Sequence, residues 1–252
     1  MRRIALTLEY EGTHFAGFQR QAKGERTVQE VLEAALAEIP GARPRVVPAG
    51  RTDAGVHALG MVVHYDTEDA IPPDRIPAAL NTRLPGDVRV LRARVAPPGF
   101  HARKSACWRA YRYRILLRKT PSALLRHRVL WYPGPLDLEA VQRSLGYLVG
   151  RHDFRAFATR EKRDTERVLY LARLRLHGQE AWLEFVGSGF LRGQVRAMVG
   201  SLLEVGAGKK PPEWIAELLA GRPRAEGGPT APPQGLYFLA AGYRPWPAVG
   251  EP

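Results

Sequence analysis

The sequence is poor in cysteine and has no long apolar run. Cys107 is the only cysteine in 252 residues, so no disulfide can form within the chain and no cysteine-based metal site can be built. No segment approaches the roughly 18 consecutive apolar residues that a membrane-spanning helix needs. The start, MRRIALTLEY, is basic and apolar like a signal peptide, but it alternates and contains Glu9, which predicts a first strand. We therefore expect a cytoplasmic protein with no membrane association.

Acidic residues are also scarce. The chain has 25 Asp and Glu against 38 Lys and Arg, a net charge of +13 and a pI near 10.3. This excess predicts an anionic partner, and nucleic acid is the commonest one. Only six of the basic residues are lysine, and the planar fork of arginine suits the phosphates and bases of structured RNA. A GC-rich genome or heat adaptation also favours arginine over lysine, but neither explains the excess of positive charge.

The periodicity predicts two halves with similar element order. The first half reads as β-α-β-β-α-β, with elements near residues 4–9, 28–39, 45–47, 61–65, 73–83 and 88–95. A break at residues 97–99 precedes a similar order, with elements near residues 107–117, 137–149, 168–176, 181–186, 190–205, 212–219 and 235–241. We expect an α+β protein with an N-terminal half over residues 1–98 and a C-terminal half over residues 99–252. Such halves, with helices on one face of an antiparallel sheet, can join edge to edge into one larger sheet.

The stretch AGRTDAGVHA, residues 49–58, concentrates chemical groups in a short segment. Asp53 lies between Arg51, Thr52 and small residues, and Gly50 and Gly55 allow close approach of a ligand or another backbone. A carboxylate beside an arginine stays ionised, which suits an anionic nucleophile or base at a loop tip. The alternative is an Arg–Asp pair that only caps a turn.

Other segments could contact an RNA ligand. The polar loop of residues 11–26 is too long for a simple connection, and loops of that length are often functional. The charged loop of residues 151–166 is either a solvated face or an RNA contact; its basic residues are Arg151, Arg155, Arg160, Lys162 and Arg163.

The histidines predict no metal site. His57 and His64 are separated by a strand segment, and no Glu-x-x-His or cysteine pattern accompanies them. His57 either contacts RNA or fixes the loop that carries Asp53, and we favour the second interpretation.

Groups of residues along nearly the whole chain share one family's pattern. They are Tyr10, Gly12, Phe15, Gly17 and Gln19; Thr27, Val28, Gln29 and Leu32; residues 50–57; Asn81, Leu84, Pro85, Asp87, Phe100 and Arg103; Tyr111 and Tyr113; residues 189–200; and residues 235–239. This pattern resembles the tRNA pseudouridine synthase A (TruA) family. Two positions depart from it, since Phe18 stands where the family usually has Trp, and Ala197 where Asn is common. Neither departure removes a chemical group that the reaction needs.

The resemblance implies an enzyme, a substrate and roles for individual residues. It implies that Asp53 is the nucleophile, that Arg196 holds Asp53, and that Tyr111 stacks on the target base and takes part in proton transfer. Arg51 is either an alternative holder of Asp53, a phosphate contact, or the group that fills the gap left by a flipped base. The further residues expected to bind substrate are His57, Phe15, Gln19, Arg20, Lys23 and Arg192.

The family isomerises uridine to pseudouridine at positions 38, 39 and 40 of the tRNA anticodon stem-loop. The resemblance therefore implies tRNA as partner, a homodimer, and a catalytic cleft between two ferredoxin-like halves. The reaction neither oxidises the substrate nor carries a group away, so we expect no cofactor. Two rival hypotheses remain. An RNA-directed glycosidase would need a second carboxylate near the scissile bond, and a non-catalytic RNA-binding module leaves Asp53 without a role.

Overall fold

The structure is a computed structural model that describes residues 1–22, 24–159 and 164–244. The chain forms two compact units. Of the described residues, the first unit contains Met1–Cys107 and residues 237–244, and the second contains Trp108–Leu236. The predicted domain boundary after residue 98 stays a prediction, while the contacts within the chain divide it after Cys107.

The first unit has the predicted order β-α-β-β-α-β. Its elements are β1 (Arg2–Tyr10), α1 (Val28–Ala37), β2 (Ala42–Pro48), β3 (His57–Thr67), α2 (Ile76–Asn81) and β4 (Val88–Val95), with a short 3-10 helix at Gly12–His14. β1 lies between β3 and β4 and pairs antiparallel with both, and β2 pairs antiparallel with β3. One further strand, β10 (Leu236–Gly242), pairs parallel with β3.

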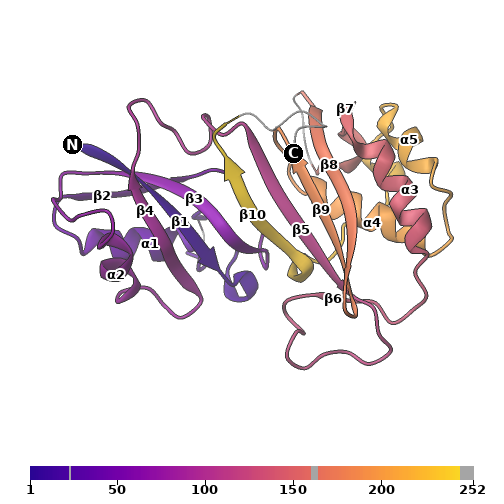
Figure 1. Ribbon diagram of the computed structural model, residues 1–252, viewed down its shortest axis with the longest axis horizontal. Coiled ribbons are helices and arrows are strands. Elements are labelled where there is room, and N and C mark those ends of the chain that lie inside the picture. The colour runs from indigo at the N-terminus through magenta and orange to yellow at the C-terminus, as the bar shows by residue number, and fades with distance from the viewer. Residues whose placement is uncertain (23, 160–163, 245–252) are drawn as a thin grey trace. The chain divides into compact units, whose positions relative to one another are not determined.

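Alternation along β1 explains why this sheet has one covered face. Ile4, Leu6 and Leu8 are fully buried, whereas Ala5 and Thr7 between them are only half-buried. The helices α1 and α2 lie together on one side of the sheet (Figure 1). Thr27 caps α1, because its hydroxyl accepts a hydrogen bond of 3.3 Å from the Glu30 backbone N–H.

The second unit has a four-stranded antiparallel sheet in the order β5-β9-β8-β7, with β6 paired to β5. Its elements are β5 (Trp108–Leu116), β6 (Leu130–Trp131), α3 (Leu138–Leu148), β7 (Gly150–Asp153), β8 (Glu166–His177), β9 (Glu180–Gly187), α4 (Gln194–Gly206) and α5 (Trp214–Leu219). Three 3-10 helices lie at Arg155–Phe157, Arg224–Glu226 and Pro233–Gly235. Asp137 caps α3, since its carboxylate accepts from the Ala140 N–H at 2.9 Å.

Several elements differ from the sequence prediction, which did not include the short strands β6 and β7. α4 starts at Gln194 rather than near residue 190, because Gly193 has a left-handed backbone with φ of 71° that interrupts the helix. β10 pairs with β3 of the first unit, so the last strand does not simply repeat the order of the second half.

The predicted α+β class is confirmed, since the described residues form ten strands that pair mostly antiparallel and few helices. In the described part of the chain, no helix combines the length and apolar character needed to cross a membrane.

Candidate active site

Asp53 lies on the short loop that joins β2 to β3. Its backbone carbonyl accepts a hydrogen bond of 3.2 Å from the Val56 N–H, which closes a tight turn around the carboxylate. The preceding residue, Thr52, is buried, and its hydroxyl is 2.8 Å from the hydroxyl of Tyr10 at the end of β1. We call residues 49–56 the aspartate loop. Its backbone is fixed on both sides of Asp53 by contacts to the first unit's own strands and turns.

The long opening loop after β1 braces the aspartate loop through its backbone. The Phe18 N–H donates to the Thr52 carbonyl at 3.1 Å, and the Gly55 N–H donates to the Phe15 carbonyl at 3.3 Å. These two hydrogen bonds join segments that are more than 30 residues apart in the sequence. The structure gives this loop a supporting role that its length alone did not predict.

Two glycines of the opening loop allow this close approach. A Cβ on Gly12 would lie 2.0 Å from the Val56 carbonyl oxygen, far closer than van der Waals contact allows. Gly17 has φ of 103°, and a Cβ there would lie 2.8 Å from the Thr52 carbonyl oxygen. Any larger residue at either position must push the aspartate loop away.

His57, the first residue of β3, contacts the opening loop next to the aspartate loop. It is 2% exposed, its Nδ1 accepts a 3.0 Å hydrogen bond from the Gly12 N–H, and its ring stacks on Tyr237 at 4.7 Å. An Nδ1 that accepts a hydrogen bond carries no proton, so this contact needs the neutral ring. This geometry agrees with the interpretation that His57 holds the loop. Its predicted contact with substrate stays a prediction.

Arg51 does not pair with Asp53. Its side chain is exposed, and it forms no hydrogen bond or ion pair with another residue in the described ranges. The simplest alternative for this segment, an Arg–Asp pair that caps a turn, is therefore not formed by these two residues. The Arg51 guanidinium is open to a ligand.

The other candidates in the opening loop differ in exposure. Phe15 is 3% exposed and lies under the Arg26 guanidinium, 4.1 Å from the ring centre, so it packs within the loop. Gln19 and Arg20 are exposed at the surface. Lys23 lies outside the described residues, as do Arg160, Lys162 and Arg163 of the charged loop.

The second unit carries the predicted tyrosines on β5. Tyr111 is 8% exposed and meets Phe190 edge to face at 5.0 Å. Tyr113 points to the same side and is fully buried, and its hydroxyl donates to the Pro232 carbonyl at 2.8 Å. Burial raises the pKa of Tyr113 well above its usual value, so its hydroxyl stays protonated and supports the strand. Phe190 had no role assigned from the sequence, although it lies in the matched stretch of residues 189–200.

Arg196 on α4 has a fixed side chain. Its Nε donates to the Ala231 carbonyl at 2.7 Å, and the Ala231 N–H donates back to the Arg196 carbonyl at 3.0 Å. The carbonyl of the next residue, Pro232, accepts from the Tyr113 hydroxyl. The segment of residues 231–232 therefore contacts both β5 and Arg196. Arg192 precedes the helix and is exposed.

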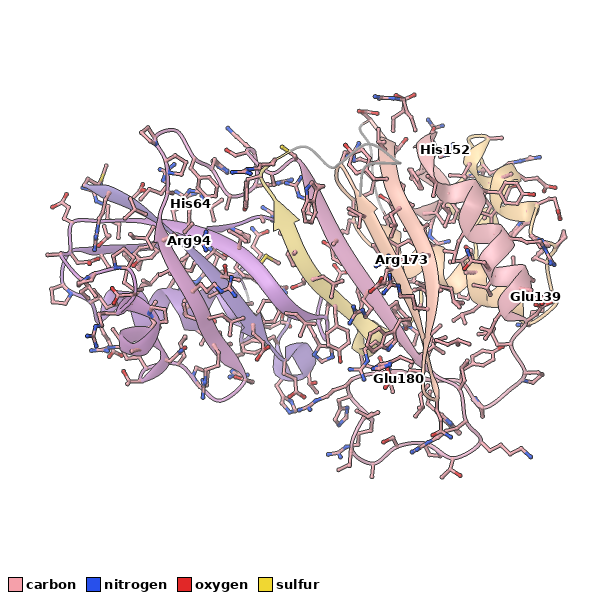
Figure 2. The ribbon with its side chains drawn as sticks, in the orientation of Figure 1. His64, Arg94, Glu139, His152, Arg173 and Glu180 are labelled. Atoms are coloured by element: carbon pink, nitrogen blue, oxygen red, sulfur yellow. The ribbon has the colours of Figure 1, made fainter. Side chains whose placement is uncertain are left out.

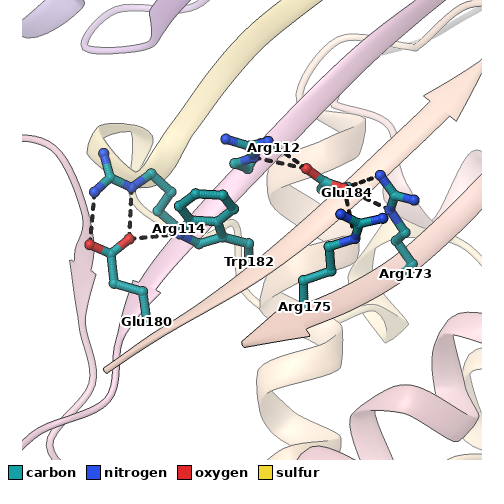
Figure 3. Close-up of polar contacts among 7 residues, drawn as sticks. All are labelled: Arg112, Arg114, Arg173, Arg175, Glu180, Trp182 and Glu184. Carbon is teal, nitrogen blue, oxygen red and sulfur yellow. Dashed lines mark hydrogen bonds and ion pairs between the residues drawn. The ribbon is translucent and has the colours of Figure 1, made fainter. Parts of the chain in front are cut away.

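A network of charges on the outer face of the second sheet holds β5 in register (Figure 3). Glu184 of β9 is 5% exposed and accepts from Arg112 of β5 at 2.7 Å and from Arg173 of β8 at 2.7 Å. Burial alone would raise the pKa of Glu184, but the hydrogen bonds and charges of the two arginines lower it below its usual range. Arg112 also lies over the ring of Trp182, at 4.0 Å. Tyr111 is the residue before Arg112, so its side chain lies on the opposite face of β5. The network therefore positions β5 from the face that does not carry Tyr111.

No group of three or more His, Cys, Asp or Glu within the described ranges is arranged to hold a metal ion.

Comparison with known proteins identifies the family. Residues 7–103 and 145–244 match the family described as tRNA pseudouridine synthase. The chain is 58% identical to tRNA pseudouridine synthase A of Thermus thermophilus over 96% of this chain and 97% of that protein. It is 46% identical to tRNA pseudouridine synthase A of Methylococcus capsulatus over 94% of this chain and 88% of that protein. The chain belongs to the tRNA pseudouridine synthase family.

A solved structure is more distantly similar. A chain titled "Crystal Structure of a Cbf5-Nop10-Gar1 Complex" superposes with a TM-score of 0.33 at 10% identity, over 79% of this chain and 45% of that chain. This likeness is too low to carry an argument.

Proposed function

We propose that this protein isomerises uridine to pseudouridine in tRNA, at positions 38, 39 and 40 of the anticodon stem-loop. The proposal rests on the match to tRNA pseudouridine synthases along most of the chain. The single structural observation that supports it best is Asp53 on a loop braced by Gly12, Gly17 and Thr52. A rigid loop of this kind suits a nucleophile that must be held in one geometry during the reaction.

The reaction moves one bond within a single nucleotide. The N1–C1′ bond of uridine breaks, and C1′ of the ribose joins C5 of the same base. The C5 proton is released and N1 gains a proton, so atoms and charge balance without an oxidant or a group carrier. Asp53 acts as the nucleophile, and the site must keep the detached uracil while it turns.

The remaining roles follow from the chemistry of each side chain. Arg196 holds the Asp53 carboxylate through a charge-assisted hydrogen bond. Tyr111 stacks on the target base and takes part in proton transfer. Arg51, which is exposed and unpaired among the described residues, contacts the RNA at the position from which the base is flipped.

We further propose that the protein works as a cytoplasmic homodimer without a cofactor. Sedimentation velocity of the purified chain at micromolar concentration tests the oligomeric state, and a single monomeric species would contradict the dimer. Activity of enzyme dialysed against a chelator, in buffer with no added small molecule, tests the cofactor statement.

The central experiment uses tRNA that carries tritium at C5 of uridine. Wild-type protein should release tritium and leave the RNA chain and its base content intact. Asp53→Ala should lower the rate by roughly 10³-fold or more, because the nucleophile is lost, while tRNA binding persists. Release of free uracil would instead identify a glycosidase, and binding without either product a non-catalytic module. Undiminished tritium release by Asp53→Ala would contradict the assigned nucleophile.

A further inference from the structure

The uncovered face of the first unit's sheet carries two arginines beside small residues. On this face Arg92 of β4 pairs in register with Thr7 of β1, and Arg94 pairs with Ala5. Because the neighbouring side chains are short, nothing on β1 covers the two guanidinium groups, and both arginines are exposed. Figure 2 marks Arg94 on this face of β4.

These arginines border a depression of about 330 Å³. Its floor includes Val62 of β3, and its far wall is formed by Phe100 and Tyr243. We call this depression, lined by Arg92, Arg94, Val62, Phe100 and Tyr243, the arginine pocket. It combines two cations with an aromatic wall in a volume that can hold a group the size of a nucleotide.

The charge of the two arginines is not compensated within the described chain. Neither the Arg92 nor the Arg94 side chain forms a hydrogen bond or ion pair with another described residue. Other arginines of the same unit are paired with acids, including Arg3 with Asp66 at 2.7 Å. An exposed arginine pair without acids, beside aromatic rings, therefore favours an anionic ligand with a planar part.

The aromatic wall is held in place before any ligand binds. The Phe100 and Tyr243 rings lie 4.8 Å apart, and the Tyr243 hydroxyl donates to the Ala102 carbonyl at 3.0 Å. The Ala102 N–H in turn donates to Nδ1 of the buried His64 at 3.1 Å. The Arg3 guanidinium donates to the Phe100 carbonyl at 2.6 Å. A ligand that contacts this wall thus does not have to order it first.

We propose that the arginine pocket binds one nucleotide of an RNA chain, with its guanidinium groups on the phosphate and its aromatic rings beside the sugar and base. The inference rests on the proposed function in one respect, namely that the RNA is the tRNA substrate. A phosphate meets both guanidinium groups at once through charge-assisted hydrogen bonds. A second protein copy would instead have to supply acids to two arginines, and this chain has only 25 acids against 38 bases.

The test compares two variants that each lose two positive charges. Arg92→Gln with Arg94→Gln removes the charges of the arginine pocket. Arg45→Gln with Arg75→Gln is the matched control, because both of these arginines are exposed in the same unit and neither lines the pocket. Equilibrium binding of a full-length tRNA transcript is measured in the Asp53→Ala background, across a series of KCl concentrations. Steady-state tritium release is measured for the same changes in the otherwise wild-type protein.

The pocket variant should bind tRNA at least about 10-fold more weakly than the control at 0.1 M KCl. The slope of log affinity against log salt should fall by about one, as expected for one lost phosphate contact. In the kinetic assay KM should rise while kcat stays unchanged. A third variant, Phe100→Leu, should weaken binding without changing the salt slope, because a stacking contact is not ionic.

Equal losses in the pocket variant and the control would overturn the proposal, since they would report net charge alone. A change in sedimentation coefficient of the pocket variant without RNA would also overturn it, because this face would then contact a second copy. The proposed function fails separately, if wild-type protein releases no tritium. In that case binding of the tRNA transcript still tests whether the arginine pocket holds RNA.

Discussion

His64 is a buried imidazole that must stay neutral in the folded protein. Burial, followed by the charges of Arg3 and His101, lowers its pKa to about 4. The neutral ring is required because Nδ1 accepts the Ala102 N–H. This single residue therefore links the end of β3 to the segment that carries Phe100.

The depressed pKa predicts a loss of stability on acidification. Above pH 6.5 His64 is neutral in both the folded and unfolded chain, so its contribution is fully present. Between about pH 6.5 and 4 the unfolded chain takes up the proton and the folded chain does not, so the free energy of unfolding falls. The total loss is at most about 3 kcal/mol, because one pKa unit corresponds to about 1.4 kcal/mol.

Urea denaturation of wild type and His64→Gln at several pH values between 7.5 and about 4 measures this effect. Glutamine can still accept from Ala102 but does not titrate, so the difference in unfolding free energy between the two proteins should shrink as the pH falls. A difference that is constant across this range would show that His64 does not titrate as its surroundings require.

Gly17 is the residue at which the opening loop approaches the aspartate loop most tightly with a left-handed backbone. Gly17→Ala should lower the rate of tritium release by roughly 10²-fold, because a shift of about 1 Å at a nucleophile has effects of this size. Gly24→Ala is the matched control. Gly24 also has a positive φ, of 71°, but a Cβ there meets nothing within 4 Å. Both variants place alanine at a positive φ, which costs about 1–2 kcal/mol in the left-handed region, so a matching loss of activity in both would argue against a role for the close approach.

At the scale of elements, the helices and strands that the sequence predicts correctly are those set by local patterns. Alternating burial along β1 and the caps at Thr27 and Asp137 are set by neighbours in sequence, so the sequence predicts them. The late start of α4 depends on the left-handed Gly193, which the apolar spacing does not reveal. The pairing of β10 with β3 joins distant parts of the chain, and no local pattern specifies such a pairing.

The candidate site shows the same division. The identities of Asp53, Tyr111 and Arg196 could be proposed because each lies in a short, distinctive motif. The brace formed by Gly12 and Gly17 could not, because it depends on two loops that approach each other in space. Whether Arg51 pairs with Asp53, two residues further on, was also open, since charged side chains close in sequence need not point toward one another.

The Glu184 network makes a prediction about the register of three strands. Glu184→Gln should lower the free energy of unfolding by about 1–3 kcal/mol, because hydrogen bonds from Arg112 and Arg173 to a buried charge are lost. Arg175→Gln should change it by less than about 0.5 kcal/mol. Arg175 is 59% exposed and 3.9 Å from the same carboxylate, and exposed pairs contribute little. Thermal and urea unfolding of both variants test this, and equal effects would show that the network is only a surface ion pair.

At the scale of the whole molecule, the last strand, β10, completes the sheet of the first unit. Phe238 on β10 is a fully buried core residue, with 0% of its surface exposed to solvent. Phe238→Ala should cost about 3–5 kcal/mol of unfolding free energy, as expected for an aromatic core residue. Leu239→Ala, at a half-buried neighbour, should cost clearly less. Urea denaturation compares the two, and a smaller loss for Phe238→Ala would mean that β10 is not part of the first unit's core.

The placement of β10 also sets the order in which the protein can be completed during synthesis. The first unit begins with Met1 but takes its last strand from Tyr237 on, after the whole second unit. About 130 residues separate the two pieces, which corresponds to roughly 6–26 s at typical translation rates of about 5–20 residues per second. Throughout that interval the parallel edge of β3 beside His57 has no partner strand from its own unit. The unit translated first is thus finished last, so the half that carries Asp53 becomes complete only after the rest of the enzyme has emerged.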